Sequence, residues 1–454
     1  MLHFFRTPGH EIGGNLLKRP TSLGSILVLA VATSMLFLSL PLERATAQSV
    51  EAKEAGGNNR AQSPVWNAAD AVSFSLPSGK SSSQVPFELL ANAIFVSARV
   101  NGRGPFLFYI DTGSSGSVFA SELVEELGMK PQGETRGTGA GSTYKMGVVR
   151  GKIEFVLAGG LKLSTQDAST VSMAGLWPLL GRRVYGDIGY DVLKDLVVQF
   201  DYEKKLATFY APATYKYSGN GQALDATLVM DYDPQIAGAF TAPGLAPVAT
   251  RFSIDTGAGG TVITAPLVKA NRLLESVQKK IPSPSHGVGG GESNDVVVRL
   301  ESISLGGYKV QQPLVALSQD TQGSLAMDSL GVNLGGNILR RFTVVIDYPG
   351  RRLILEPNSH FADLFQADAS GLVVKAEGDD FRTFVVQGIV PGSPAADAGM
   401  QEGDVITAID GEPAGKYALW EIQDQLKNSG HLLRLSVKRG TRSFTYELQL
   451  RALA

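Results

Sequence analysis

The chain of 454 residues is 43% hydrophobic and 19% charged, which is typical of a globular protein and long enough for about three domains. Its formal net charge of −2 offers no basic surface, so we expect no nucleic-acid partner. The lack of cysteine excludes disulfides, thiolate metal sites and cysteine nucleophiles. Chemistry must therefore come from carboxylates, hydroxyls or the five histidines.

The N-terminal segment has the pattern of an export signal. Arg6, Lys18 and Arg19 precede an apolar run from about residue 23 to 40, and Ala45-Thr46-Ala47 offers the small residues that a signal peptidase reads. The run is near the ~18 residues at which a membrane-spanning helix becomes possible, so residues 1–47 are either a signal peptide cleaved after Ala47 or a membrane anchor. Both alternatives predict an exported protein, periplasmic or extracellular.

Residues 48–84 predict a flexible linker. They are rich in Ser, Ala, Gly, Asn and Gln and contain few large apolar side chains. From residue 85 onward apolar and polar residues alternate in short runs separated by turn residues, which indicates strands.

Two nearly identical stretches stand out among these strands. Phe108–Phe119 reads Phe-Tyr-Ile-Asp-Thr-Gly-Ser-Ser-Gly-Ser-Val-Phe, and Phe252–Ile263 reads Phe-Ser-Ile-Asp-Thr-Gly-Ala-Gly-Gly-Thr-Val-Ile. Each predicts a buried strand, an Asp-Thr-Gly turn and a second short strand. A single Asp-Thr-Gly arises by chance in roughly one chain in ten of this length. Two copies in the same strand-turn-strand context are strong evidence that the two units are related. Asp111 and Asp255 thus occupy matching places.

The surrounding elements repeat as well, which predicts two duplicated lobes over residues 85–215 and 216–360. Each lobe is expected to contain a short helix and a glycine-rich stretch after its Asp-Thr-Gly turn. Each is also expected to end in a hairpin, the first containing Val197–Tyr202 and the second Val344–Tyr348. The predicted fold is mainly β.

The two lobes resemble the retropepsin and pepsin-like aspartic proteases over residues 85–357, and the segment from Val85 to Gly113 is especially similar to the aspartyl-protease domains of bacterial exported proteins. The resemblance implies two retropepsin-like β-barrel lobes that form one bilobal protease, with a catalytic pair made of Asp111 and Asp255. It also implies a polypeptide substrate in the interlobe cleft, no metal and no cofactor. Because both lobes lie in one chain, we expect a monomer. The family's apolar-apolar-glycine motif would fall at Gly189 and Gly335, but Asp187 and Asn333 replace its first apolar residue.

A pair of aspartates suits the hydrolysis of a peptide bond. Two carboxylates about 3 Å apart cannot both ionise, so they share one proton, as aspartic protease dyads are known to do. The ionised member can take a proton from water while the protonated member acts as the acid toward a peptide carbonyl. The residues expected to support the pair are Thr112, Gly113, Ser114, Thr256, Gly257 and Ala258.

These supporting residues have separate predicted roles. The glycines allow the backbone to approach the carboxylates, and the resemblance implies that the threonines tie each loop to the opposite lobe. Ser114 in the first loop has Ala258 as its counterpart in the second. A hydrogen bond from the Ser114 hydroxyl to Asp111 would stabilise the charged carboxylate. We therefore hypothesise that Asp111 is the more acidic member of the catalytic pair.

A glycine-rich stretch in the first lobe has two interpretations. It is either the tip of a flap hairpin that closes over substrate, as the family places it, or an ordinary β-turn. The residues concerned are Gly137, Thr138, Gly139, Ala140 and Gly141, with Tyr144 as a wall residue of the cleft.

Residues 365–454 resemble a PDZ domain. The most specific features are Pro391-Gly392-Ser393-Pro394-Ala395 and the hairpin around Gly403-Asp404-Val405-Ile406. The resemblance implies a β-rich α+β fold that binds a peptide C-terminus as an added strand. The expected binding residues are Gly371, Leu372, Val373 and Val374. The alternative is a PDZ fold that only packs against the protease.

Together these features predict an exported aspartic endopeptidase whose PDZ domain recognises peptide C-termini or regulates access. Two alternatives stay open. The lobes and the PDZ domain can form a non-catalytic peptide-binding or scaffold protein, or the enzyme can be a processing protease that cleaves only when its PDZ domain engages a tag.

Overall fold

The computed structural model describes residues 73–283, 287–288, 291 and 293–453. The predicted signal peptide or anchor and most of the predicted linker lie outside these residues. Within the described part of the chain, no helix is long and apolar enough to cross a membrane.

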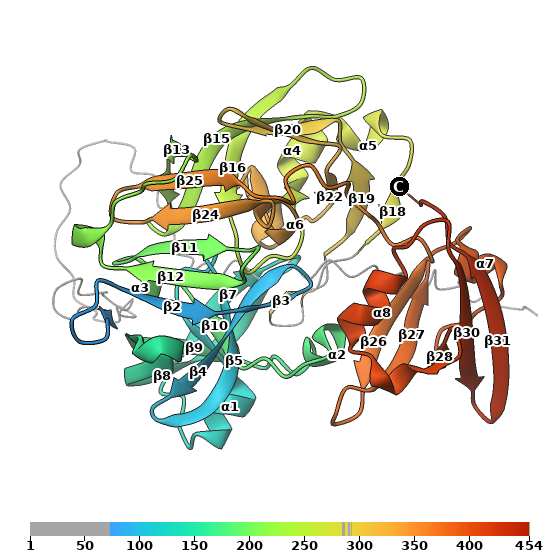
Figure 1. Ribbon diagram of the computed structural model, residues 1–454, viewed down its shortest axis with the longest axis horizontal. Helices are drawn as coiled ribbons and strands as arrows, with labels where there is room; N and C mark the ends of the chain where they lie inside the picture. The colour runs from blue at the N-terminus through green and yellow to red at the C-terminus, as the bar shows by residue number, and fades with distance from the viewer. Residues whose placement is uncertain (1–72, 284–286, 289–290, 292, 454) are drawn as a thin grey trace, which may run out of the picture.

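The described strands form four sheets, and the fold is mainly β, as predicted (Figure 1). The first lobe is built on the sheet ordered β1-β9-β6-β10-β5-β4-β8-β7, with β3 paired to β4. Its strands are β1 Phe74–Ser75, β3 Glu88–Leu90, β4 Ala93–Val100, β5 Arg103–Ile110, β6 Val118–Ala120, β7 Glu134–Gly139, β8 Ser142–Leu157, β9 Lys162–Val171 and β10 Gly186–Ile188. Its α-helices are α1 Ser121–Glu126, α2 Trp177–Leu180 and α3 Tyr190–Leu193.

The second lobe repeats this arrangement. Its sheet order is β18-β19-β22-β17-β23-β16-β15-β20-β21, with β14 paired to β15. The strands are β14 Thr227–Val229, β15 Asp233–Thr241, β16 Val248–Ile254, β17 Val262–Ile263, β18 Ile281–Pro282, β19 Asp295–Arg299, β20 Ser302–Leu305, β21 Tyr308–Gln311, β22 Leu314–Ser318 and β23 Val332–Leu334. Its α-helices are α4 Ala265–Ala270, α5 Leu273–Ser276 and α6 Gly336–Leu339.

The duplication is clearest at the centre of each sheet. In the first lobe β10 runs parallel to β5 and antiparallel to β6, and in the second lobe β23 runs parallel to β16 and antiparallel to β17. The loops that follow β5 and β16 carry the two Asp-Thr-Gly sequences. The predicted two-lobed fold is therefore confirmed.

The closing hairpins differ from the prediction, because they do not complete separate lobes. They join in one interlobe sheet ordered β13-β25-β24-β11-β12-β2, in which β11 pairs antiparallel with β24. The strands are β2 Ser82–Pro86, β11 Val197–Asp201, β12 Leu206–Tyr210, β13 Gln222–Asp225, β24 Phe342–Asp347 and β25 Arg352–Pro357. Backbone hydrogen bonds thus connect the two lobes directly, and this sheet fixes their relative position.

The end of the predicted linker is also part of the fold. β1 pairs with β9, and β2 forms the edge of the interlobe sheet against β12. The Ser73 hydroxyl donates to the Val192 carbonyl oxygen. The flexible-linker prediction is therefore wrong for residues 73–84, because Val85 and its neighbours carry enough alternating apolar surface to pair with a strand far away in sequence.

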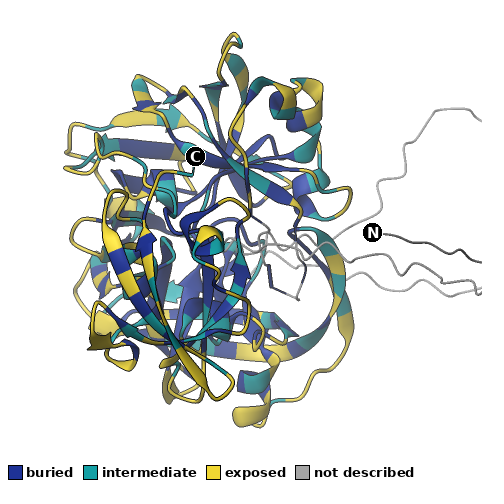
Figure 2. Cartoon of the chain, turned by 90° about the vertical axis from the view of Figure 1, so that its right-hand side faces the viewer, coloured by how far each residue is buried: buried dark blue, intermediate teal, exposed yellow. Residues whose placement is uncertain are grey.

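The third unit has a hydrophobic core of its own. Its sheet is ordered β26-β27-β28-β30-β31, with β29 paired to β28. The elements are β26 Leu372–Glu377, β27 Thr383–Ile389, β28 Val405–Ile409, β29 Glu412–Pro413, β30 Leu432–Arg439, β31 Arg442–Gln449, α7 Pro394–Asp397 and α8 Leu419–Gln425. Figure 2 shows buried residues alternating with exposed or intermediate ones along several of these strands.

A buried arginine anchors the connection into this unit. The Arg341 side chain is 1% exposed, and its guanidinium donates to the carbonyl oxygens of His360, Phe361 and Asp363. It also lies over the Phe365 ring at 3.6 Å from the centroid. The chain therefore leaves the second lobe at a fixed point.

We expect the interlobe sheet to hold both lobes in one cooperative unit. Phe200 in β11 is fully buried, so Phe200→Ala should lower the free energy of unfolding by about 3–5 kcal/mol. The exposed Lys204→Ala is the control and should change it by less than about 1 kcal/mol. Urea denaturation measures both. A loss below about 1 kcal/mol for Phe200→Ala would contradict this role.

Candidate active site

The two aspartates are placed by the strands beneath their loops. The Asp111 N–H donates to the Ile188 carbonyl oxygen and the Asp255 N–H to the Leu334 carbonyl oxygen, each at 3.1 Å. Ile188 and Leu334 end β10 and β23, the strands that lie between the two strands of each Asp-Thr-Gly unit. Each loop therefore leaves its sheet at a position fixed by backbone pairing.

Reciprocal threonine bonds join the loops across the lobe boundary. The Thr112 hydroxyl donates to the Ile254 carbonyl oxygen, and the Thr256 hydroxyl donates to the Ile110 carbonyl oxygen, each at 2.6 Å. In return the Thr256 N–H donates to Thr112 Oγ1 at 3.1 Å. Each threonine thus ties its loop to the opposite lobe, as the resemblance implied.

The two glycines let the carboxyl groups face each other. A Cβ on Gly113 would lie 2.9 Å from Asp255 Cγ, and a Cβ on Gly257 would lie 2.5 Å from Asp111 Cγ. Real Cβ atoms do not approach that closely, so any side chain at either glycine would push the opposite carboxyl group away. The structure therefore brings Asp111 and Asp255 together at the lobe boundary.

Burial makes ionisation of both groups unfavourable. Asp111 is 1% exposed and Asp255 0% exposed. Burial, then the charge of Asp255 and then that of Asp187, raise the pKa of Asp111 well above its usual range. Burial also raises the pKa of Asp255, but hydrogen bonds to its charged form limit the rise to about 6.

The hypothesis that Ser114 makes Asp111 the more acidic member is wrong. The Ser114 hydroxyl donates to the Gly116 carbonyl oxygen at 2.7 Å. Asp255 Oδ1 accepts the N–H groups of Gly257 and Ala258 at 2.9 Å each, and Oδ2 accepts the Asn333 side-chain amide at 2.8 Å. Donors to a carboxylate lower its pKa, so Asp255 is the more acidic member.

The decisive difference between the lobes lies below the loops. Asn333 in β23 and Asp187 in β10 occupy equivalent positions, opposite Ser253 and Tyr109 of the neighbouring parallel strands. The amide can donate to Asp255, whereas an ionised Asp187 can only accept. Asp187 Oδ1 accepts the Val118 N–H at 3.0 Å, and its Oδ2 is buried without a hydrogen-bond partner among the described residues.

In the sequence, Asp187 and Asn333 stand out only as polar replacements in the family's apolar-apolar-glycine motif. The available signal was the polar substitution itself, because a polar residue in a buried strand beside a catalytic loop needs a partner. Asp255, the hydrogen-bond partner of Asn333, is distant in sequence and could not be identified from the spacing of residues.

The expected flap is a hairpin with a docked tip. β7 and β8 pair as Gly137 with Tyr144 and as Gly139 with Ser142, leaving Ala140 and Gly141 at the tip. Ala140 forms an isolated bridge with Gly323 of the second lobe and is buried in a cluster with Val262 and Leu325. The Tyr144 side chain packs against the main core. The tip therefore reaches across to the opposite lobe instead of ending in solvent.

The predicted PDZ binding residues lie at one edge of the third unit. Gly371 has a φ of 78°, in the left-handed region that favours glycine, and Leu372, Val373 and Val374 begin the edge strand β26. Among the described residues, no group of three or more His, Asp or Glu side chains is arranged to hold a metal ion.

These features define a class: two duplicated β lobes that meet at paired Asp-Thr-Gly loops, followed by a small β-rich domain with β26 as an edge strand of its sheet. Residues 96–192 and 241–334 match the family model described as aspartyl protease, and residues 385–439 match the PDZ domain model. The chain therefore consists of two aspartyl-protease-like lobes and a C-terminal PDZ domain.

Two solved structures are similar to parts of the chain. The aspartic proteinase from Irpex lacteus is 14% identical over 62% of this chain and 98% of its own, with a TM-score of 0.42. The HtrA3 PDZ domain bound to a phage-derived ligand is 22% identical over 19% of this chain and 86% of its own, with a TM-score of 0.17. No curated protein matches the chain.

The buried Asp187 carboxyl, whose Oδ2 has no hydrogen-bond partner among the described residues, predicts a pH-dependent stability. Burial raises its pKa well above the usual range. A carboxyl whose pKa is raised on folding binds its proton more tightly in the folded state. Its contribution is thus full below the unfolded pKa of about 4 and is lost as pH rises through the folded pKa.

Asp187→Asn should therefore raise the thermal midpoint at pH 7.5 and change it less at pH 4.5, because the amide carries no charge at either pH while its oxygen can still accept from Val118. Differential scanning calorimetry at both pH values tests this. Equal shifts at the two pH values would contradict a buried, titrating carboxyl.

Proposed function

We propose that the protein is an aspartic endopeptidase that hydrolyses peptide bonds between Asp111 and Asp255. The observation that carries the proposal is the meeting of two buried carboxyl groups from matching loops, each loop tied to the opposite lobe by a threonine. The match to the aspartyl protease family model supports the same function.

The difference in acidity assigns the roles. Asp255 is the ionised member and acts as the base, and Asp111 holds the proton and acts as the acid. Asp255 removes a proton from water as the water oxygen attacks the peptide carbonyl carbon, while Asp111 gives its proton to the carbonyl oxygen. Asp255 then passes its proton to the amide nitrogen, Asp111 recovers a proton from a hydroxyl of the intermediate, and the C–N bond breaks. Both groups return to their starting states.

The proposal also covers where the protein acts and which peptides it binds. The N-terminal apolar segment supports export to the periplasm or the extracellular space, by a signal peptide or an anchor. The PDZ domain match supports recognition of peptide C-termini, with Leu372–Val374 as the strand that receives them. The polypeptide substrate would extend between the lobes beneath the β7–β8 hairpin.

Replacing either aspartate tests catalysis. Asp111→Asn and Asp255→Asn should each lower the rate of casein hydrolysis at least ~1,000-fold, because one amide in the pair removes either the base or the acid. The exposed Asp231→Asn is a control and should retain the wild-type rate. Casein hydrolysis that persists in both variants would refute the dyad mechanism. No hydrolysis by the folded wild type would favour a peptide-binding scaffold.

The role of Asn333 makes a separate prediction. Asn333→Ala removes the amide donor to Asp255, so the pKa of Asp255 should rise and the acid limb of the pH-rate profile should move up by about one pH unit. Ser114→Ala is the matched control and should leave that limb in place, since Ser114 donates to a backbone carbonyl. A limb that moves in Ser114→Ala and not in Asn333→Ala would reverse the assignment of base and acid.

A further inference from the structure

The free edge of the PDZ sheet is contacted by the first lobe. β26 is the edge strand of that sheet, and α8 packs beside it. PDZ domains receive a peptide as an added strand at such an edge, bordered by a helix. In this chain α2 of the first lobe packs against β26 (Figure 1).

The contact lies within the groove and not only beside it. Gly181, which ends α2 with a φ of 64°, has its backbone against both walls of the groove. A Cβ there would lie 2.9 Å from Leu419 Cβ, at the start of α8, and 3.7 Å from Ala376 Cβ in β26. Gly181 therefore lies against both walls, where an added strand would run.

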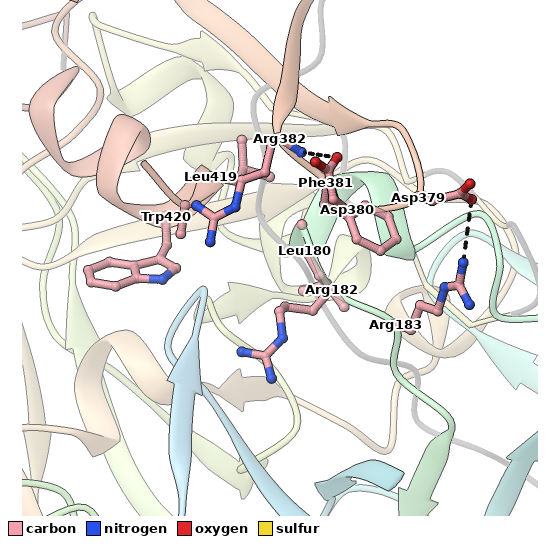
Figure 3. A pocket seen from close by; sticks show the side chains of 11 residues that line it. Leu180, Arg182, Arg183, Asp379, Asp380, Phe381, Arg382, Leu419 and Trp420 are labelled. Carbon is pink, nitrogen blue, oxygen red and sulfur yellow. Dashed lines mark hydrogen bonds and ion pairs between the residues drawn. The ribbon is translucent and has the colours of Figure 1, made fainter. Parts of the chain in front are cut away.

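Neighbouring side chains extend this contact. The Arg183 guanidinium lies 3.6 Å from an Asp379 carboxylate oxygen and 5.7 Å from the centre of the Trp177 ring. Beside this contact, a cavity of about 430 Å³ is lined by Leu180–Arg183 of the first lobe and by Asp379–Arg382 and Ala418–Trp420 of the PDZ domain. Figure 3 shows this arrangement, with side chains of the two domains facing each other across the pocket.

The other end of the groove contains a cavity between the PDZ domain and the second lobe. This second cavity, of about 230 Å³, is lined by Leu372–Val374 and Leu426 of the PDZ domain and by Gly259-Gly260 of the second lobe. Most of the cavity surface near β26 is aliphatic, which suits an apolar C-terminal side chain. Gly259 and Gly260 belong to the loop that begins at Asp255, so the loop of the proposed active site also contributes to this cavity.

We infer that Leu180–Arg183 is an internal occupant of the PDZ groove and that it competes with peptides that end in an apolar residue with a free carboxylate. The inference rests on the proposed PDZ ligand class. A cavity remains where the last residue would bind, but the preceding residues of a peptide need the place that Gly181 fills. Binding of such a peptide and docking of the PDZ domain onto α2 are therefore mutually exclusive.

The test compares two glycines that have the same backbone conformation and different surroundings. Gly181→Asn places a Cβ against Leu419, whereas Gly128→Asn, at a φ of 69°, has nothing within 4 Å of the added Cβ. Asparagine tolerates positive φ, so backbone strain is similar in the two variants. Only Gly181→Asn should displace the PDZ domain from α2.

The probe is a fluorescein-labelled nonapeptide of Gly and Ser ending in Leu-Val, with its C-terminal amide as the negative control. By fluorescence anisotropy on the full chain, Gly181→Asn should bind the free-carboxylate peptide at least ~10-fold more tightly than wild type, and Gly128→Asn should match wild type. Equal, measurable affinity in all three proteins would overturn the internal occupant while leaving PDZ ligand binding intact. No binding by any of them would overturn the PDZ ligand class and the inference with it.

A second measurement does not depend on the folding of a variant. Saturating peptide should increase amide hydrogen exchange of residues 177–183 in the wild-type protein, because their cover is removed. If the peptide binds and this exchange stays the same, the two events are not exclusive and the inference is wrong.

Discussion

The structure depends on holding two buried carboxyl groups face to face while only one of them is charged. Isolated burial of either charge would be costly, and burial of both charges together would be more so. The chain meets this constraint with glycines that admit the opposite carboxyl, threonines that cross the lobe boundary and an interlobe sheet that fixes the distance between the lobes. Small changes in lobe position would separate the pair.

Duplication alone would give two equivalent aspartates, and the chain departs from symmetry in one layer below them. Asn333 supplies a donor that favours a charged Asp255, while burial, the charge of Asp255 and, to a lesser extent, that of Asp187 raise the pKa of Asp111. The same two strand positions therefore push the pKa values of the pair apart, which is what separates an acid from a base. The loops add to this asymmetry, because Asp255 Oδ1 accepts the N–H groups of Gly257 and Ala258, whereas Asp111 Oδ1 accepts that of Gly113.

Much of the fold and the site could be predicted from the sequence, since the repeated Asp-Thr-Gly units and the PDZ motifs are local patterns of consecutive residues. The shared interlobe sheet could not, because β11 and β24 are distant in sequence and either hairpin could equally have closed its own lobe. The wrong assignment for Ser114 has a similar cause: a short hydroxyl next to a carboxylate in sequence can donate to a nearby carbonyl instead, as it does to Gly116. The docking of Gly181 into the PDZ groove also had no sequence signal, because a glycine that ends a short helix is ordinary.

The central claim is that Asp111 and Asp255 share one proton and act together on a peptide bond. The most direct test is the pH dependence of kcat/KM for one cleaved peptide, which reports the ionisation of both groups in the free enzyme. The account predicts a bell-shaped profile, because activity needs one carboxyl charged and the other protonated. A profile that is flat from pH 4 to 8, or that has a single limb, would contradict a proton-sharing pair.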